Sequence, residues 1–170
     1  MDVMEAIVKR RSIRSFLRKP IEPAKLEQVL EAGRQAPSAS NQQPWRIVVV
    51  TDPETCQRLA HAARDQKFVG EAPAVLVGCA IKTDRVMTCG QHCYPIDLGI
   101  CMTTMSLAAV SLGLGTCWVG AFFEDKVKDI LGIPADVRVV ELMPLGYPAE
   151  EPSARPRKPM GEFAVMDKWA

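Results

Sequence analysis

The sequence lacks the motifs that mark several common enzyme classes. It contains only two histidines, His61 and His92, so histidine-based catalysis has few candidates. No G-x-S-x-G segment occurs, which excludes a serine hydrolase of the nucleophile-elbow type. No G-x-x-x-x-G-K-[ST] segment occurs, which excludes a Walker phosphate loop. The segment 113–118 begins like a dinucleotide fingerprint, but Trp118 stands where the third glycine belongs.

The sequence also lacks an excess of charge of either sign. Its 21 basic residues nearly cancel its 20 acidic ones, which leaves a formal charge of +1. A general nucleic-acid binder carries a strongly basic field, so that class is excluded and any anion site must be local. The length of 170 residues and the apolar fraction of 48% predict one folded domain with its own core.

The longest stretch without charge tests whether the chain enters a membrane. It covers the 26 residues from Leu98 to Phe123, which is long enough to span a bilayer. Because Gly113 and Gly115 divide it into a helix-length piece and a strand-length piece, we expect a core helix followed by a core strand.

The N-terminus and the cysteines indicate in which cellular compartment the protein is expected. Residues 1–11 hold five charged side chains and no apolar run that could serve in a secretory signal, so we expect a cytoplasmic protein. Six cysteines are present, and in a reducing compartment we expect them to be buried free thiols.

The apolar patterns predict helices alternating with strands. Helices are expected over residues 1–10, 23–33, 53–64, 94–112 and 124–131, and strands over 45–51, 73–81, 116–120 and 137–145. Four strands alternating with helices predict a three-layer α/β or α+β domain. From Tyr147 the chain carries four prolines and then Phe163, Val165, Met166 and Trp169, which predicts an extended arm. That arm lies either on its own domain or across a partner subunit.

Two basic clusters stand near the two ends of the chain. Residues 9–16 hold four positive charges and two serines, and a second cluster contains Arg155, Arg157 and Lys158. Guanidinium groups with a small hydroxyl suit a phosphate, although an isolated charge run is more often a solvated surface. Two clusters in an otherwise neutral chain favour the phosphate interpretation.

The segment Ala36–Trp45 is dense in small polar side chains. Ser38, Ser40, Asn41 and Gln43 supply uncharged donors and acceptors, and two prolines stiffen the segment. Such groups suit the edge of a heteroaromatic ring and a polyol, or else form an ordinary polar connection.

The segment Cys89–Cys93 is the obvious candidate for a metal site. It supplies three soft ligands, Cys89, His92 and Cys93, but a structural metal site draws a second pair from elsewhere. The alternative is a solvent-exposed loop before the central helix.

Five motifs, in this order, resemble the nitroreductase family of FMN-dependent oxidoreductases. They are Arg10–Arg14, Ala36–Trp45, Asp97–Ile100, Gly113–Gly120 and Arg157–Pro159. The resemblance implies an α+β fold with three layers, in which a central mixed or antiparallel sheet carries helices on both faces. It implies a homodimer with FMN at the interface and C-terminal arms exchanged between subunits. Residues 1–146 are then a single FMN-binding domain, and residues 147–170 are the arm.

The resemblance also implies the site residues. Flavin N5 carries the chemistry, so no side chain is assigned as catalytic and none as a metal ligand. Gln66 and Lys67 fall near a family position beside the N1–O2 edge of the ring. The implied cofactor-binding residues are Arg10, Arg11, Ser12, Arg14, Pro37, Ser38, Asn41, Gln43, Val119, Gly120, Arg157 and Lys158.

The implied reaction passes hydride from NADH or NADPH through flavin N5 to an electron-poor acceptor, a nitroaromatic, a quinone or a similar small molecule, by a ping-pong mechanism. The segment between Ile81 and Tyr94 is too short for an inserted lid, so we expect an open, permissive site. The alternatives are a flavin-binding carrier or sensor without turnover, and a metal-binding module that uses Cys89, His92 and Cys93.

Overall fold

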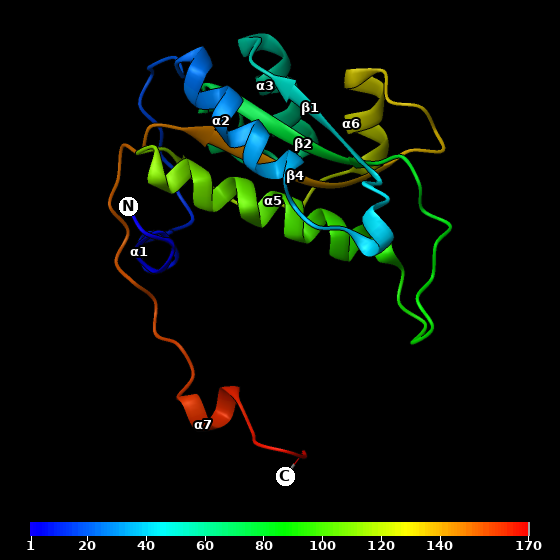
Figure 1. Cartoon of the computed structure of the whole chain (residues 1–170). Helices are drawn as coiled ribbons and strands as arrows, with labels where there is room; N and C mark the ends of the chain where they lie inside the picture. Colours follow the sequence, from blue (N-terminus) through cyan, green and yellow to red (C-terminus); the bar gives the residue numbers. More distant parts are fainter. Residues whose placement is uncertain (170) are drawn as a thin grey trace.

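The fold is described from a computed structural model, which covers residues 1–169. Its centre is a four-stranded sheet in the spatial order β1-β2-β4-β3, and every named strand pair is antiparallel. Helices pack on both faces of the sheet (Figure 1). The strands are β1 (Trp45–Val50), β2 (Ala74–Ala80), β3 (Gly115–Thr116) and β4 (Arg138–Gly146). The helices are α1 (Val3–Lys9), α2 (Pro23–Arg34), α3 (Pro53–Ala62), α4 (Lys67–Glu71), α5 (Cys93–Ser111), α6 (Glu124–Leu131) and α7 (Met160–Phe163), with a 3-10 turn, η1, at Ala39–Asn41.

Strand β2 shows how the sequence produces the three layers. All seven of its residues are buried. Because side chains alternate across a strand, Val75 and Val77 enter the core on the side of α3 and α6, and Leu76 enters the core on the side of α2 and α5. A strand covered on both faces must be apolar throughout. The predicted α+β three-layer fold is therefore confirmed, with an antiparallel sheet.

Most predicted helix ends agree with the structure because they rest on local chemistry. Asp52 caps α3 by accepting a hydrogen bond from the Thr55 N–H at 2.8 Å, and Pro53 occupies the first turn. Helix α6 ends at Gly132, which adopts the left-handed conformation at φ 63°.

Three elements differ from the sequence predictions. The strand expected over 116–120 covers only Gly115–Thr116, and the chain rejoins the sheet through a single bridge between Val119 and Leu142. Helix α3 stops at Ala62 because the chain turns through left-handed residues at Arg64 and Asp65. Helix α4 was not expected, since five residues that include a valine and a glycine carry too little helical pattern.

Helix α5 is the long central helix and confirms the expected core helix. By length and composition it could cross a membrane, but 44% of its apolar window is buried inside the domain, and core helices meet the same criterion. One side, with Leu98, Met102 and Met105, is completely buried against the sheet. Ile96 and Ile100 on the other side are exposed. Within residues 1–169 that second side has no full cover.

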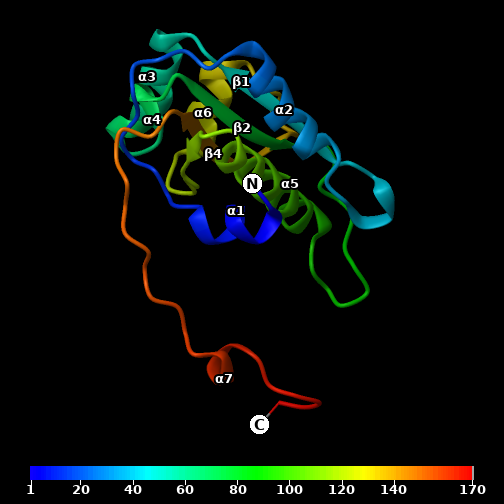
Figure 2. The ribbon, with the colours of Figure 1, turned by 60° about the vertical axis from the view of Figure 1, so that its left-hand side comes forward.

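The C-terminal segment stays with the domain for a few residues and then leaves it. The Leu17 N–H donates to the Tyr147 carbonyl and the Ala149 N–H donates to the Ser15 carbonyl, both at 2.9 Å. Beyond this pairing the chain extends away, and α7 stands apart from the sheet and its helices in Figures 1 and 2. The apolar side chains of this arm are 53–93% exposed: Met160, Phe163, Val165, Met166 and Trp169.

Candidate functional site

The first basic cluster is held against the edge of the sheet. Helix α1 ends at Lys9 and is capped by Arg10. The chain then runs extended, with Ser12 bridged to Thr116 and the Ile13 N–H bonded to the Thr116 carbonyl at 2.9 Å. Ile13 is buried beside Gly115, where a β-carbon would lie only 2.5 Å from Ile13 Cγ1. Glycine at 115 therefore permits the close approach that places Arg10–Arg14 at the sheet edge.

The two basic clusters meet in one hollow of about 850 Å³. Five arginines line it, and Glu150 is its one acidic lining residue. Guanidinium groups gathered around a serine form a strong local anion site in a chain of nearly zero net charge. Lys158 does not line the hollow. The polar lining consists of Arg10, Arg11, Ser12, Arg14, Glu150, Ser153, Arg155 and Arg157.

The Arg11 side chain is fixed by two hydrogen bonds and has one buried donor without an acceptor in the described part of the chain. Its Nη1 donates to the carbonyls of Val8 at 2.6 Å and Arg10 at 2.9 Å, which fixes the side chain. Its Nε is buried and has no hydrogen-bond partner among residues 1–169. A buried donor without an acceptor is costly. An anionic ligand in the hollow, such as the phosphate of FMN, would supply that acceptor.

The thiol of Cys117 lies beside this cluster, whose charges affect the pKa of the thiol. Burial raises the pKa of Cys117, while the positive charges of Arg14 and Arg10 and a hydrogen bond with Ser12 act in the opposite direction. Arg10, Ser12 and Arg14 therefore all lie near Cys117.

The turn after β3 lies close to Arg14. Gly120 is exposed, and a β-carbon there would meet no atom within 4 Å. The Gln66 side chain donates to the Ala63 carbonyl at 2.8 Å and to the Ala121 carbonyl at 3.1 Å. The Arg14 guanidinium lies 5.9 Å from the Phe68 ring centre, on α4, which begins directly after Gln66. The open space at Gly120 is where a flat ring system could approach the backbone.

The polar loop Pro37–Gln43 lies elsewhere in the same chain. The Ala39 N–H donates to Asp97 Oδ1 at 3.0 Å, near the N-terminal end of α5. Arg11 instead shares a second hollow with Val110, near the C-terminal end of α5. Asp97 and Val110 are about 20 Å apart along a helix that rises 1.5 Å per residue. Figures 1 and 2 show η1 and α1 at opposite ends of α5.

One chain therefore does not bring all the predicted binding residues together. Arg10, Arg11, Ser12, Arg14 and Arg157 share the arginine-lined hollow. Val119 and Gly120 lie beside Ala121 and Gln66. Pro37, Ser38, Asn41 and Gln43 stand at the far end of α5. The sequence prediction left out Arg155, which lines the hollow with Arg157. Because alternate residues of an extended chain point to the same side, the spacing of these two arginines was a usable signal.

The segment Cys89–Cys93 forms the end of a hairpin. The Met87 N–H donates to the Gln91 carbonyl at 2.8 Å, and Gly90 turns through φ 88°. Cys89 is exposed and Cys93 is buried, so the two thiols face different surroundings. Within residues 1–169 no group of three histidine, cysteine or acidic side chains could hold a metal ion. The metal-module alternative therefore lacks a ligand set.

The six cysteines are all free, and five of them are buried, as expected. Cys89 is the exposed one. Burial raises the pKa of Cys56, Cys79 and Cys101 to about 11, so these side chains are neutral core thiols at physiological pH.

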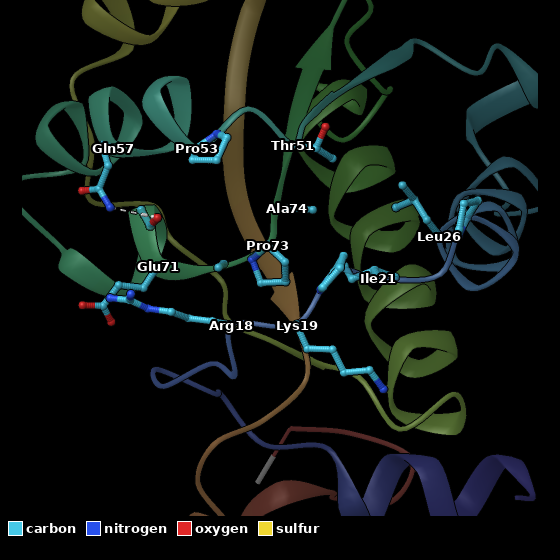
Figure 3. Close-up of a pocket in the computed structure, with 14 residues that line it drawn as sticks. Arg18, Lys19, Ile21, Leu26, Thr51, Pro53, Gln57, Glu71, Pro73 and Ala74 are labelled. Carbon is cyan, nitrogen blue, oxygen red and sulfur yellow. Dashed lines mark hydrogen bonds between the residues drawn. The ribbon is translucent and has the colours of Figure 1, made fainter.

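A separate hollow of about 700 Å³ lies between α2, α3 and α4. Pro20, Pro23, Pro53 and Pro73 wall it, and none of the predicted site residues lines it (Figure 3). Lys19 at its rim is already engaged, with its Nζ 4.0 Å from the Tyr147 ring centre. The arginine-lined hollow is therefore the better candidate for the cofactor site.

Comparisons with known proteins identify the family and the fold. A family model described as "Nitroreductase family" matches residues 7–88 and 60–147. A protein of Thermus thermophilus named NADH dehydrogenase is 34% identical over 94% of this chain and 93% of its own length. Nitroreductase A from Vibrio parahaemolyticus superimposes with a TM-score of 0.91 at 31% identity, covering 100% of this chain and 77% of that one. The NADPH:FMN oxidoreductase from Vibrio harveyi, solved with NAD+, gives a TM-score of 0.87 at 31% identity, covering 99% and 78%.

Proposed function

The chain belongs to the nitroreductase family, and from that membership we propose how its site works and which acceptors it reduces. The protein is an FMN-dependent oxidoreductase that uses NAD(P)H. We propose that its acceptors are nitroaromatics, quinones or similar electron-poor molecules, reduced by a ping-pong mechanism. The observation that carries the flavin site in this proposal is the hollow that five arginines line together with Ser12.

FMN, when bound, supplies hydride transfer at N5 between the nicotinamide and the acceptor. The protein's own groups bind and orient. Arg10, Arg11, Ser12 and Arg14 hold the phosphate, and the buried Arg11 Nε finds its acceptor there. Arg157 and Lys158, joined by Arg155, bring further positive charge from the C-terminal arm.

The turn at Val119–Gly120 is assigned to the ring. The exposed Gly120 leaves open space where a flat ring can approach the backbone. Gln66 and Lys67, at the start of α4, are assigned to the N1–O2 edge, where the positive charge of Lys67 favours the reduced ring. The Gln66 amide donates to the carbonyls of Ala63 and Ala121 and so holds the start of α4 against the turn after β3. No side chain needs to act as a base.

The distance along α5 supports a composite site in a homodimer. The loop residues Pro37, Ser38, Asn41 and Gln43 of one subunit complete the flavin site of the other. The surface available for the second subunit is apolar. Ile96, Ile100 and Trp118 are 38–45% exposed, and four apolar side chains of α1 are 46–71% exposed: Val3, Met4, Ile7 and Val8. A contiguous apolar patch of this kind marks an association surface.

The arm provides a second link between subunits. Residues 1–146 serve as the flavin-binding domain and residues 147–170 as an arm exchanged with the partner. Its five large apolar side chains are exposed in the single chain and need a surface to cover them. The free thiols suit a reducing compartment, so we assign the protein to the cytoplasm.

The direct test is spectroscopic. Purified protein reconstituted with FMN is expected to be yellow and to bleach on addition of NADH or NADPH under anaerobic conditions. Subsequent addition of a quinone or a nitroaromatic is expected to restore the flavin absorbance. Double-reciprocal plots of the initial rate against the nicotinamide concentration, at several acceptor concentrations, are expected to be parallel lines. Bound flavin that dithionite reduces but neither nicotinamide reduces would instead indicate a carrier without turnover.

A further inference from the structure

The loop Pro37–Gln43 has an unusual backbone. Ser40, Asn41 and Gln43 have φ values of 50°, 53° and 47°, in the left-handed region that residues other than glycine seldom adopt. Residues 40–43 are exposed, so core packing does not impose this conformation. Backbone of this kind persists only where surrounding interactions hold it, and it is found preferentially at functional sites.

Two of the holding interactions lie within the loop. The Gln43 N–H donates to Ser38 Oγ at 2.9 Å, and the Gln43 side-chain amide donates to Asn41 Oδ1 at 3.0 Å. These bonds close the loop on itself. They do not fix its position on the domain, which requires contacts to other elements.

Asp97 supplies the first of those contacts. Its Oδ1 accepts the Ala39 N–H at 3.0 Å across 58 residues of sequence. Asp97 is 4% exposed, and its Oδ2 is buried without a partner among residues 1–169. It is also the one charged residue in α5, a helix otherwise built of apolar and small polar side chains. A buried carboxylate is costly, so its bond to the loop is the contact that accounts for its position.

Arg85 supplies the second contact between the loop and another element. Its Nη2 donates to Ser40 Oγ at 2.8 Å. The Arg85 carbonyl accepts the Cys93 N–H at 3.1 Å and the next residue, Val86, bridges to His92, so the hairpin gives the guanidinium a fixed base. Arg85 forms no ion pair with the described residues 1–169. Its one side-chain bond there goes to the loop.

We propose that Arg85 and Asp97 are positioning residues that hold the Pro37–Gln43 loop of each subunit against the flavin of its partner. This inference rests on the composite site proposed above. Asp97 acts through the Ala39 N–H and Arg85 acts through the Ser40 hydroxyl. Without these anchors the left-handed residues relax to ordinary backbone, and the loop no longer presents its polar groups to the ring.

A double-mutant cycle tests the Arg85 anchor. Arg85→Ala and Ser40→Ala are each expected to weaken FMN binding about tenfold, the loss expected for a hydrogen bond to a charged group. The double variant is expected to lose no more than either single variant, because both remove the same bond. Lys82→Ala, an exposed cation three residues before Arg85, serves as the matched control and keeps wild-type affinity. The measurements are FMN fluorescence titration and the visible circular dichroism of the bound flavin.

Two substitutions of Asp97, one conservative and one not, test its role. Asp97→Asn keeps an oxygen that accepts the Ala39 N–H and is expected to retain FMN affinity, whereas Asp97→Leu is expected to lose it. If Asp97→Leu does not fold, the Arg85 cycle still decides the question. Wild-type affinity in the Arg85 and Ser40 variants, or fully additive losses, would overturn the proposal.

A mixed dimer tests whether the loop acts across the interface. One subunit carries Arg14→Gln and the other carries Arg85→Ala. If the loop acts in the partner's flavin site, both substitutions fall in the same site and the other site stays intact. One wild-type FMN site per dimer is therefore expected. A dimer without a wild-type site would overturn the proposal. Absence of FMN binding by the wild-type protein would contradict the proposed function instead, so the two failures are distinguishable.

Discussion

Val119 and Leu142 exchange two backbone hydrogen bonds, from the Val119 N–H to the Leu142 carbonyl at 2.9 Å and from the Leu142 N–H to the Val119 carbonyl at 3.1 Å. The Val119 N–H is therefore already satisfied inside the protein. The next N–H, of Gly120, makes no hydrogen bond to the described part of the chain. Of the two residues assigned to the flavin ring, Gly120 is thus the one whose backbone N–H the described residues leave free to donate.

The first prediction follows from this turn. Gly120→Val is expected to leave the folded domain intact, because a β-carbon at this position meets no atom within 4 Å. The branched side chain would occupy the space assigned to the ring, so FMN affinity is expected to fall at least about 100-fold, as for a blocked backbone approach. Thermal unfolding of the apoprotein and FMN titration measure the two effects. Unchanged FMN binding would remove Gly120 from the site.

The second prediction separates phosphate binding from ring binding. Arg14→Gln is expected to weaken FMN binding about 10–100-fold, the range for a hydrogen bond to a charged group. It is expected to leave the affinity for riboflavin unchanged, because riboflavin has no phosphate. Arg58→Gln, on the exposed face of α3, is the control. Equal losses for FMN and riboflavin would show that Arg14 contacts the ring or the sugar chain instead.

The third prediction concerns the arm. Truncation after Pro152 removes Arg155, Arg157 and all the exposed apolar side chains of the arm. Burying four such side chains on a partner is worth on the order of 6–10 kcal/mol before entropy is subtracted. The truncated chain is therefore expected to lose flavin and dimer together. Sizing chromatography with absorbance detection measures both, and a flavin-loaded dimer would show that the arm does not join the subunits.

The fourth prediction concerns a buried acid on β4. Glu141 lies opposite Gly78, is 2% exposed, and neither of its carboxyl oxygens has a partner among residues 1–169. Burial raises the pKa of Glu141 to about 9 from 4.5. The folded state therefore holds a proton that the unfolded state releases between these pH values, and stability falls as the pH rises through that window.

The size of this effect can be measured by substitution. For one proton the slope is about 1.4 kcal/mol per pH unit. Glu141→Gln is expected to lose this slope between about pH 5 and pH 9 and to be more stable than the wild type at pH 8. Denaturant unfolding at several pH values measures it, with the exposed Glu54→Gln as control. Parallel stability curves for the wild type and Glu141→Gln would contradict a neutral buried acid.

Local chemistry explains what could be predicted of the fold. The apolar run of β2, the cap at Asp52 and the break at Gly132 depend on residues within a few positions, so their elements were expected nearly at the observed bounds. Helix α4 escaped prediction because packing against α3, rather than its own five residues, stabilises it. The predicted strand at β3 was too long for a related reason, because its pairing with β4 decides where the strand stops.

The order of residues along the chain already specifies the parts of the candidate site: a basic run, a polar loop, a glycine turn and a basic arm. Which of these parts lie together depends on the packing of the helices on the sheet. It brings Arg14 and Arg157 to one hollow and leaves Gln43 at the other end of α5. It also joins Asp97 to Ala39 and Arg85 to Ser40. The physical reason is range: caps and periodicity act between near neighbours, whereas contacts across 45 or more residues depend on how helices pack on the sheet.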